Sequence, residues 1–341
     1  MYKKYSKNST FYMSTKEDFF LNNSDLLEEA IKKNQLYSKQ PKRINCKLCQ
    51  LALTNKIDFQ SHGVEYVFCE KCNHLNGIYD DTLSFVEKIY IKKSGEEYAS
   101  NYLDVNYKKR ATEVYLPKLD FLQSILPKKK NKLLDIGTGS GYFVYSALLR
   151  NMNAKGLDVS KTMVEFGNSQ IQQILGSSPL IYTEEEDFYE QIKSTDADVV
   201  SAIGVIEHLR QPNKFFEAFN QSEAEYLYYS VPMFSLSVFL ENISKNVFPR
   251  QLSGGHTHLF TEESIVEMNK ILNVSALGEW RFGTDIMDLY RHLIVNLHLN
   301  DVSQKMIEYL QSGIGSNLDD LQKILDLNHF CSEIHVVAAK I

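Results

Sequence analysis

The sequence of 341 residues has no long apolar run, few prolines and no excess of basic side chains. No window approaches the roughly 18 consecutive apolar residues of a membrane-spanning helix, so no membrane span is predicted. The 37 lysines and arginines are outnumbered by 43 acidic residues, which argues against a protein that grips nucleic-acid backbone over a wide surface. With only seven prolines and 16 glycines, we expect no long flexible linker.

The first 20 residues begin with basic side chains but contain neither an apolar run nor a small-residue cleavage site. A secretory signal has both, so we expect a cytoplasmic protein. The length and a hydrophobic fraction of 43% suffice for a full core. They suggest either two domains or one large α/β domain with an appendage, and they leave the oligomeric state open.

Four of the five cysteines form two close pairs, Cys46–Cys49 in CKLC and Cys69–Cys72 in CEKC. Paired CxxC units in a reducing compartment are typical of metal ligands rather than disulfides. The 19 residues between the pairs allow both turns to wrap one tetrahedral Zn²⁺ with four thiolates. We therefore predict a structural zinc site, because four thiolates leave no open position for catalysis, and we expect the nearby His74 at the surface.

From Lys132 onward, strand-like and helix-like segments alternate, which predicts a doubly wound, mostly parallel seven-stranded α/β sheet with right-handed crossovers. The expected strands lie at 133–137, 154–159, 179–183, 197–204, 225–231, 275–282 and 332–339. Ser24 or Asp25 is expected to cap an earlier helix that ends at about Tyr37. The predicted division is a polar helical segment at 1–44, a zinc-binding module at 45–80, a helical connector or lid at 81–127, and the α/β domain at 128–341 with a helical insertion around 284–328.

A glycine-rich turn follows the first predicted strand, in LLDIGTGSGYF. Glycines allow positive φ and bring the backbone close to a ligand, and the helix behind them presents free N–H groups. Asp135, just before the turn, would repel a pyrophosphate, so a ligand with an ammonium or amino-acid group fits better. Asp158 ends the second strand in GLDVS, 21 residues after Gly137, where an acid can accept both hydroxyls of a ribose.

The fourth predicted strand runs into IGVIEHLRQP at 203–212, which places Ile203, Glu207 and His208 at the carboxyl edge of the sheet. LLDIGTGSG, GLDVS and DADVVSAIGVIEHLRQP resemble, in order and spacing, the motifs of class I S-adenosylmethionine-dependent methyltransferases over about residues 110–235. The resemblance implies a Rossmann-like methyltransferase fold, and S-adenosylmethionine as the methyl donor.

The resemblance also implies which residues hold the donor. Asp135 would lie near its amino group, Asp158 would hold the ribose hydroxyls, and Ile203 would lie beneath the sulfonium end. The methionine end would be lined by Gly137, Gly139 and Gly141. The acid that meets the adenine would come from TEEEDF at 183–188, where the choice stays open among Glu184, Glu185, Glu186 and Asp187.

A four-cysteine module in front of such a domain is similar to sugar C-methyltransferases and related enzymes of glycan pathways. This resemblance implies a small acceptor, a sugar nucleotide or glycan precursor, that is methylated at oxygen or carbon. A quinone-type or other small-molecule O-methyltransferase stays open. So does a non-catalytic methyltransferase-like module whose zinc element docks protein or RNA. The GxGxG spacing and Asp135 disfavour a nicotinamide-dependent oxidoreductase.

Histidine is the natural base near neutral pH, and three histidines are candidates for accepting the acceptor's proton. His256 and His258 lie in GGHTHLFTEES, on a loop after the fifth strand where the acceptor would enter. Alternation places them on one side of an extended segment, and a structural loop role is the competing interpretation. His208 beside Glu207 is the rival base, for which packing or closing of the cleft is the competing role.

Two further groups are expected near the site. For the first group the competing interpretation is a packed tyrosine-rich helix face, and for the second it is a simple helix start. The first group would form part of a cofactor lid and the second would line the acceptor pocket: Tyr98, Tyr102 and Arg110 for the lid, and Trp280, Asp285 and Asp288 for the pocket.

Overall fold

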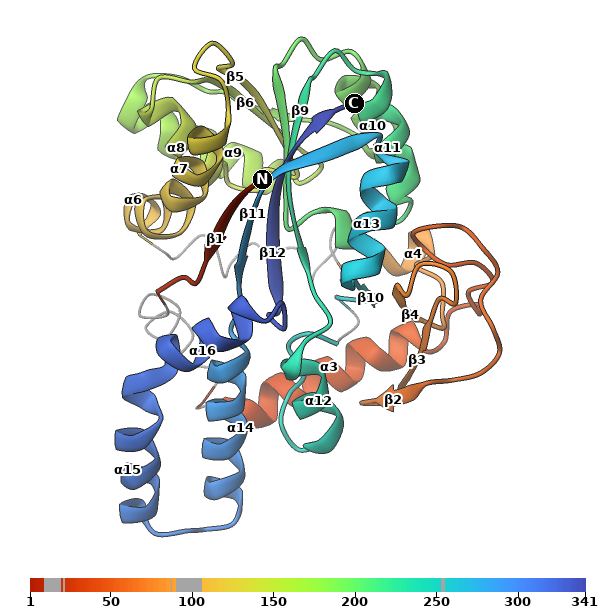
Figure 1. Cartoon of the computed structure of the whole chain (residues 1–341), viewed down its shortest axis with the longest axis vertical. Helices are drawn as coiled ribbons and strands as arrows, with labels where there is room; N and C mark the ends of the chain where they lie inside the picture. The colour runs from red at the N-terminus through yellow and green to blue at the C-terminus, as the bar shows by residue number, and fades with distance from the viewer. Residues whose placement is uncertain (9–19, 21, 87, 90–105, 253–254) are drawn as a thin grey trace.

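Two sheets organise the computed structural model (Figure 1), which describes residues 1–8, 20, 22–86, 88–89, 106–252 and 255–341. The larger sheet has eight strands in the order β1-β11-β12-β9-β8-β5-β6-β7, and the smaller has four in the order β10-β4-β3-β2. Tyr98 and Tyr102 lie outside the described residues. Within the described part of the chain, no helix combines the length and apolar character needed to cross a membrane.

The larger sheet confirms the predicted fold class. Five neighbouring strands run parallel: β5 (Lys132–Ile136), β6 (Asn153–Asp158), β7 (Leu180–Tyr182), β8 (Val199–Ile203) and β9 (Tyr226–Pro232). β12 (Glu333–Lys340) is antiparallel to both β9 and β11 (Val274–Phe282). The sheet has eight strands rather than seven, because β1 (Tyr2–Tyr5) pairs in parallel with β11.

Helices cover both faces of this sheet (Figure 1). The buried side chains of neighbouring strand positions point to opposite faces and join two separate cores. One core takes side chains from α7 (Leu116–Ile125), α8 (Tyr142–Leu149) and α9 (Lys161–Leu175). The other takes them from α10 (Glu185–Lys193), α11 (Pro212–Gln221) and α13 (Glu262–Ile271). A doubly wound sheet of this kind exposes the carboxyl ends of its parallel strands for ligands.

Short helical elements precede and follow this core. α4 (Leu83–Val86), α6 (Tyr107–Arg110) and the π-helix η2 (Ala111–Tyr115) come before α7. The 3-10 helix η3 (Ile206–His208) follows β8, and α12 (Leu236–Ile243) follows β9. The predicted C-terminal helical insertion consists of α14 (Asp285–Leu299), α15 (Gln304–Gly313), the 3-10 turn η4 (Gly315–Asn317) and α16 (Leu318–Leu327).

The N-terminal helix α3 (Asn23–Tyr37) is present, but the predicted caps are wrong. The helix begins before Ser24, and the side chain of the preceding Asn22 makes no capping hydrogen bond. Glu28, predicted to complete a capping arrangement, instead pairs with Lys32 at 2.6 Å, four residues along the helix. The exposed i,i+4 pair competes for the side chain that a capping box would need.

The smaller sheet joins two distant parts of the chain. β2 (Phe59–Ser61), β3 (Val64–Phe68) and β4 (Leu75–Gly77) come from the cysteine-containing segment. The fourth strand, β10 (His258–Leu259), comes from the histidine-containing loop and pairs antiparallel with β4. Figure 1 shows β10 between α13 and this module. Any movement of the module would therefore move the loop that carries the candidate histidines.

Candidate active site

The glycine turn between β5 and α8 has a backbone that only glycine adopts easily. Gly137, Gly139 and Gly141 have φ of 59°, 55° and 74°, values in the left-handed region. A Cβ on Gly137 would lie 2.6 Å from the Val205 side chain, and one on Gly141 would lie 2.6 Å from Leu180. The turn therefore combines positive φ with close packing at the N-terminus of α8.

Asp158 ties this turn to the end of β6. Its Oδ2 accepts a hydrogen bond from the Gly139 N–H at 2.7 Å, and its Oδ1 accepts one from the Ser160 N–H at 2.8 Å. Burial raises the pKa of the carboxyl, whereas these backbone hydrogen bonds work in the opposite direction. Each oxygen retains a second lone pair for a ligand hydroxyl. The glycine turn and the predicted ribose acid therefore form one unit.

Asp135 lies near the end of β5 and is buried. The Ser201 hydroxyl donates to its Oδ1 at 2.6 Å. Burial raises the pKa of Asp135 to about 7, although the hydrogen bond from Ser201 opposes this shift. Ile203 is half-buried at the end of the adjacent strand β8. All six predicted donor-binding residues thus lie at the carboxyl ends of β5, β6 and β8 or in the turn after β5.

The raised pKa of Asp135 predicts a pH-dependent stability. The folded protein holds this proton up to about pH 7, whereas an unfolded chain releases it near pH 4. Stability from this group therefore falls as pH rises through that window. We expect the free energy of unfolding of Asp135→Asn, relative to the unsubstituted protein, to rise by up to about 4 kcal/mol between about pH 4.5 and pH 8. Urea unfolding at both pH values measures it, and a pH-independent difference would contradict the assignment.

The four candidate adenine acids begin α10 rather than line a buried site. Glu184, Glu186 and Asp187 are exposed and Glu185 is half-buried. The Tyr182 hydroxyl donates to the Glu184 carboxylate, and Glu185 lies 3.8 Å from Arg210. The choice among the four stays open, because each position also suits the first turn of a helix.

The three candidate bases divide between two environments. His258 is buried, and both of its ring nitrogens are engaged: Nε2–H donates to the Glu207 carbonyl at 3.0 Å, and Nδ1 accepts from His74 Nε2–H at 2.7 Å. Burial lowers the pKa of His258 well below its usual value. A base needs a ring nitrogen that can reach the acceptor, so the prediction of His258 as the base is not supported. The surface position expected for His74 is wrong, because the 258–260 segment covers it and leaves it fully buried.

His208 and His256 lie together with Glu207. The two imidazole rings are 5.2 Å apart, and His208 Nε2 is 3.9 Å from Glu207 Oε1. His256 Nδ1–H donates to the Gln251 carbonyl at 3.1 Å. Burial raises the pKa of Glu207 to about 8 and lowers that of His208 to about 3. Glu207 stands two residues after Val205, and the Val205 side chain packs against the glycine turn.

The four paired cysteines, which flank the strands β2 and β3 in sequence, converge into one cluster. The sulfur atoms of Cys46 and Cys72 are 3.7 Å apart, and those of Cys49 and Cys69 are 3.5 Å apart. All four lie within 4.8 Å of one another. A tetrahedral Zn²⁺ with Zn–S bonds near 2.3 Å separates its sulfurs by about 3.8 Å, whereas a disulfide needs about 2.05 Å. The donor set and spacing therefore fit a four-thiolate zinc site.

The two cysteine turns share one backbone geometry. Gln50 and Asn73, each directly after the second cysteine of its pair, have φ of 61° and 55°. The Gln50 N–H donates to the Cys46 carbonyl at 3.0 Å, and the Asn73 N–H donates to the Cys69 carbonyl at 2.8 Å. This repetition presents two thiols from each turn to a common centre, as the spacing of the cysteines predicts.

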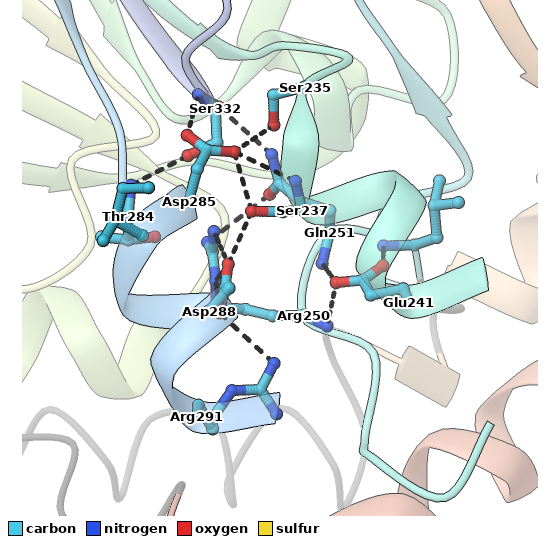
Figure 2. A network of polar contacts seen from close by, with 12 residues as sticks. Ser235, Ser237, Glu241, Arg250, Gln251, Thr284, Asp285, Asp288, Arg291 and Ser332 are labelled. Atoms are coloured by element: carbon cyan, nitrogen blue, oxygen red, sulfur yellow. Dashed lines mark hydrogen bonds and ion pairs between the residues drawn. The ribbon is translucent and has the colours of Figure 1, made fainter. Parts of the chain in front are cut away.

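The residues predicted to line the acceptor pocket are buried in structural contacts. Trp280 is 1% exposed, and its indole N–H donates to the Ser6 carbonyl at 2.9 Å. Figure 2 shows Asp285 and Asp288 at the start of α14. Asp285 accepts hydrogen bonds from Ser235, Ser237 and Ser332, while Asp288 is bound by Arg250 and Arg291. The helix-start interpretation therefore holds for both acids, and the pocket-lining prediction is not supported.

The structure contains a second polar cluster that the sequence analysis did not predict. His335 on β12 bonds Glu333 through Nε2 at 2.7 Å and the Tyr228 hydroxyl through Nδ1 at 2.8 Å. Lys118 Nζ lies 4.0 Å from Glu333, and Arg110, a predicted lid residue, stacks over Tyr142 at 5.3 Å. Glu333 and His335 share β12, but Tyr228 and Lys118 come from another strand and from a helix, so no local spacing in the sequence could have joined them to this pair.

One comparison with known proteins bears on the class of this chain. Residues 107–273 match a family described as methyltransferase domain, whereas the curated proteins gave no match. The chain therefore carries a methyltransferase domain, and the predicted enzyme class, class I S-adenosylmethionine-dependent methyltransferase, is confirmed. The alternative of a nicotinamide-dependent oxidoreductase is wrong.

Three solved structures show a partial similarity to this chain. Magnesium protoporphyrin IX methyltransferase from Synechocystis PCC 6803 is 12% identical, with a TM-score of 0.48, over 76% of this chain and 100% of that one. Phosphoethanolamine N-methyltransferase 2 from Haemonchus contortus is 18% identical, with a TM-score of 0.44, over 78% and 62%. Geranyl diphosphate C-methyltransferase from Streptomyces coelicolor A3(2) is 10% identical, with a TM-score of 0.41, over 70% and 87%. At such identities the similarity does not extend to the acceptor.

Proposed function

We propose that this enzyme methylates an oxygen or carbon atom of a sugar nucleotide or glycan precursor, with S-adenosylmethionine as the donor. The observation that carries the proposal is the arrangement at one edge of the sheet. The unit formed by the glycine turn and Asp158 lies there. Glu207 and His208 follow the adjacent strand β8, and His256 meets them from the loop before β10. In this proposal a donor site and a proton-accepting group are neighbours.

In this proposal the backbone of the glycine turn and Asp135 hold the methionine end of the donor. Asp158 accepts the two ribose hydroxyls, and Ile203 lies beneath the sulfonium. The acceptor atom forms a bond to the methyl carbon, the carbon–sulfur bond breaks, and its electron pair returns to sulfur to give S-adenosylhomocysteine. The protein's main task is alignment, because the sulfonium methyl is already electrophilic.

The acceptor's proton needs a receiver, and His256 and His208 are the proposed bases. The carbonyl of Gln251 fixes the Nδ1–H tautomer of His256, which leaves Nε2 able to take a proton. Burial lowers the pKa of His208 to about 3, which keeps it neutral but makes it the weaker proton acceptor, so His256 is the first candidate of the two. Glu207, whose pKa burial raises to about 8, can exchange a proton with the pair near neutral pH.

We also propose that Cys46, Cys49, Cys69 and Cys72 bind one structural Zn²⁺. The ion would hold the two cysteine turns together and thereby fix β4 and its partner β10. The division at 1–44, 45–80, 81–127 and 128–341 and a cytoplasmic location belong to the same proposal. A quinone-type or other small-molecule O-methyltransferase is the second candidate, because the same base and donor arrangement serves any acidic hydroxyl.

A double substitution tests the histidines. In His208→Ala/His256→Ala we expect S-adenosylhomocysteine formation to fall at least about a hundredfold, the usual contribution of a positioned base, while calorimetric affinity for S-adenosylmethionine stays the same. His329→Ala, an exposed histidine 3.7 Å from Glu262, is the matched control and should keep full turnover.

The acceptor class is tested with a panel of sugar nucleotides and quinols. Turnover with a sugar nucleotide supports the proposal, and turnover confined to quinols would replace it with the second candidate. Full turnover in the double variant would exclude both histidines as the base.

A further inference from the structure

We propose that Glu207, His208 and His256 bind one divalent transition-metal ion, separate from the four-thiolate site. One ligand atom from each side chain lies within 4.8 Å of the other two. One carboxylate and two imidazoles form a ligand set that suits Zn²⁺, Mn²⁺, Fe²⁺ or Co²⁺ better than the all-oxygen sets preferred by Mg²⁺ and Ca²⁺. Small side-chain movements would bring the three groups to coordination distance.

The two imidazoles are oriented as metal-binding histidines usually are. His256 donates Nδ1–H to the Gln251 carbonyl at 3.1 Å, and His208 hydrogen-bonds the backbone of Gly255. A ligating histidine almost always gives its second N–H to a carbonyl or carboxylate, which fixes the tautomer and turns the other nitrogen toward the ion. The loop that contains Gln251 and Gly255 thus supplies the hydrogen bonds that would orient both histidines toward the ion.

The loop itself is held by a buried carboxylate (Figure 2). Glu241 on α12 is fully buried and accepts the backbone N–H groups of Arg250 and Gln251, each at 2.6 Å, and that of Leu252 at 2.9 Å. The Gln251 side chain donates to the carbonyls of Met233 and Ser332. These bonds fix the Gln251 carbonyl that orients His256, so the histidine sits on a rigid support.

Glu207 provides the independent sign that a ligand belongs here. The residue is 5% exposed, and its Oε2 has no hydrogen-bond partner among the described residues. A buried carboxylate oxygen without a partner is costly, and a cation would satisfy it. The neighbouring Lys47 does not fill this role, because its ammonium is paired with the buried carboxylate of Asp81.

An adjacent cavity of about 10 Å³ offers room for one further ligand. Glu207 and His208 line it together with Lys47, Asp81 and Thr257, among others, and this volume suits a single water molecule. Three protein ligands would leave coordination positions for acceptor oxygens. An ion at this place makes a bound hydroxyl more acidic, so the acceptor class that fits is one with a hydroxyl, or two neighbouring hydroxyls as in a sugar.

This acceptor role rests on the proposed function, whereas binding of the ion does not. With the ion present, His208 and His256 would act as neutral ligands and would not receive the acceptor's proton directly. That proton would pass to solvent. Metal affinity measured without donor or acceptor therefore separates the two proposals.

The site is tested by titrating with Mn²⁺ the full chain loaded with only one equivalent of Zn²⁺, which the four thiolates bind in preference to the mixed ligand set, and by following the Mn²⁺ with electron paramagnetic resonance. Zinc in the thiolate site leaves Mn²⁺, which prefers oxygen and nitrogen ligands, to report on this cluster. We expect one bound Mn²⁺ per chain and at least about tenfold weaker binding in both Glu207→Gln and His256→Ala, since a lost ligand should cost no less than a lost outer contact. Glu184→Gln and His329→Ala, which alter an acid and a histidine outside the cluster, should bind as the unsubstituted chain does.

No Mn²⁺ binding by the unsubstituted chain would overturn the site, and this result does not depend on whether a variant folds. Equal affinity in folded Glu207→Gln and His256→Ala, checked by circular dichroism, would overturn it too. Binding that leaves the rate with every active acceptor unchanged would support the site and overturn its role in acceptor activation. A bound Mn²⁺ with no turnover on any acceptor would support the site while the proposed acceptor class fails.

Discussion

Asp158→Ala should weaken the binding of S-adenosylmethionine at least about a hundredfold, because two hydrogen bonds from ribose hydroxyls to a charged carboxylate contribute about 1.5–3 kcal/mol each. The same change frees the N–H of Gly139, which Asp158 holds at 2.7 Å, so the glycine turn also loses an anchor. Titration calorimetry of the folded variant measures the loss.

The control for this prediction is Asp25→Ala, which removes an exposed acid in the first turn of α3. We expect its affinity to stay within about threefold of the unsubstituted value, the scale of a surface substitution. Unchanged affinity in Asp158→Ala would show that the carboxylate does not hold the ribose.

Cys72→Ser should abolish stoichiometric zinc binding and unfold the cysteine module. Structural zinc contributes about 10–16 kcal/mol of apparent binding free energy in small zinc modules, and three thiolates hold the ion far more weakly than four. Because β4 pairs with β10, we also expect loss of the buried contact between His74 and His258. Elemental analysis gives the metal content, and thermal unfolding gives the loss of stability.

Cys331→Ser is the matched control, since this cysteine is buried beside Glu333 and takes no part in the cluster. It should retain one zinc per chain. Zinc-free protein from a purification without chelator would contradict the four-thiolate proposal. Full zinc content in Cys72→Ser would show that Cys72 is not a ligand.

The sequence predicts the elements whose residues signal their own structure. LLDIG and DVVSAIG are apolar runs of strand length and become the buried strands β5 and β8. The glycines at 137, 139 and 141 predict a turn with positive φ, which all three adopt. The strands β1 and β10 escape prediction because one is the polar tetrapeptide YKKY and the other is two residues long. Their pairing partners, β11 and β4, lie far away in sequence.

The site is less predictable because its contacts join distant residues. His74 and His258 are 184 positions apart, and only the pairing of β4 with β10 reveals that His258 is internally bonded. Likewise, nothing local distinguishes His256, whose partner is the Gln251 carbonyl, from His258 two residues later. The motif at 203–212 places Glu207 at the correct edge, but its unpartnered oxygen depends on tertiary packing.

The central claim is that the glycine turn, Asp135 and Asp158 form the site for the methyl donor. Calorimetric titration of the unsubstituted chain with S-adenosylhomocysteine, the product that retains the ribose and the amino-acid group, tests this claim most directly. We predict saturable heat with one ligand bound per chain. A folded protein that releases no heat with either this product or the donor would contradict the account.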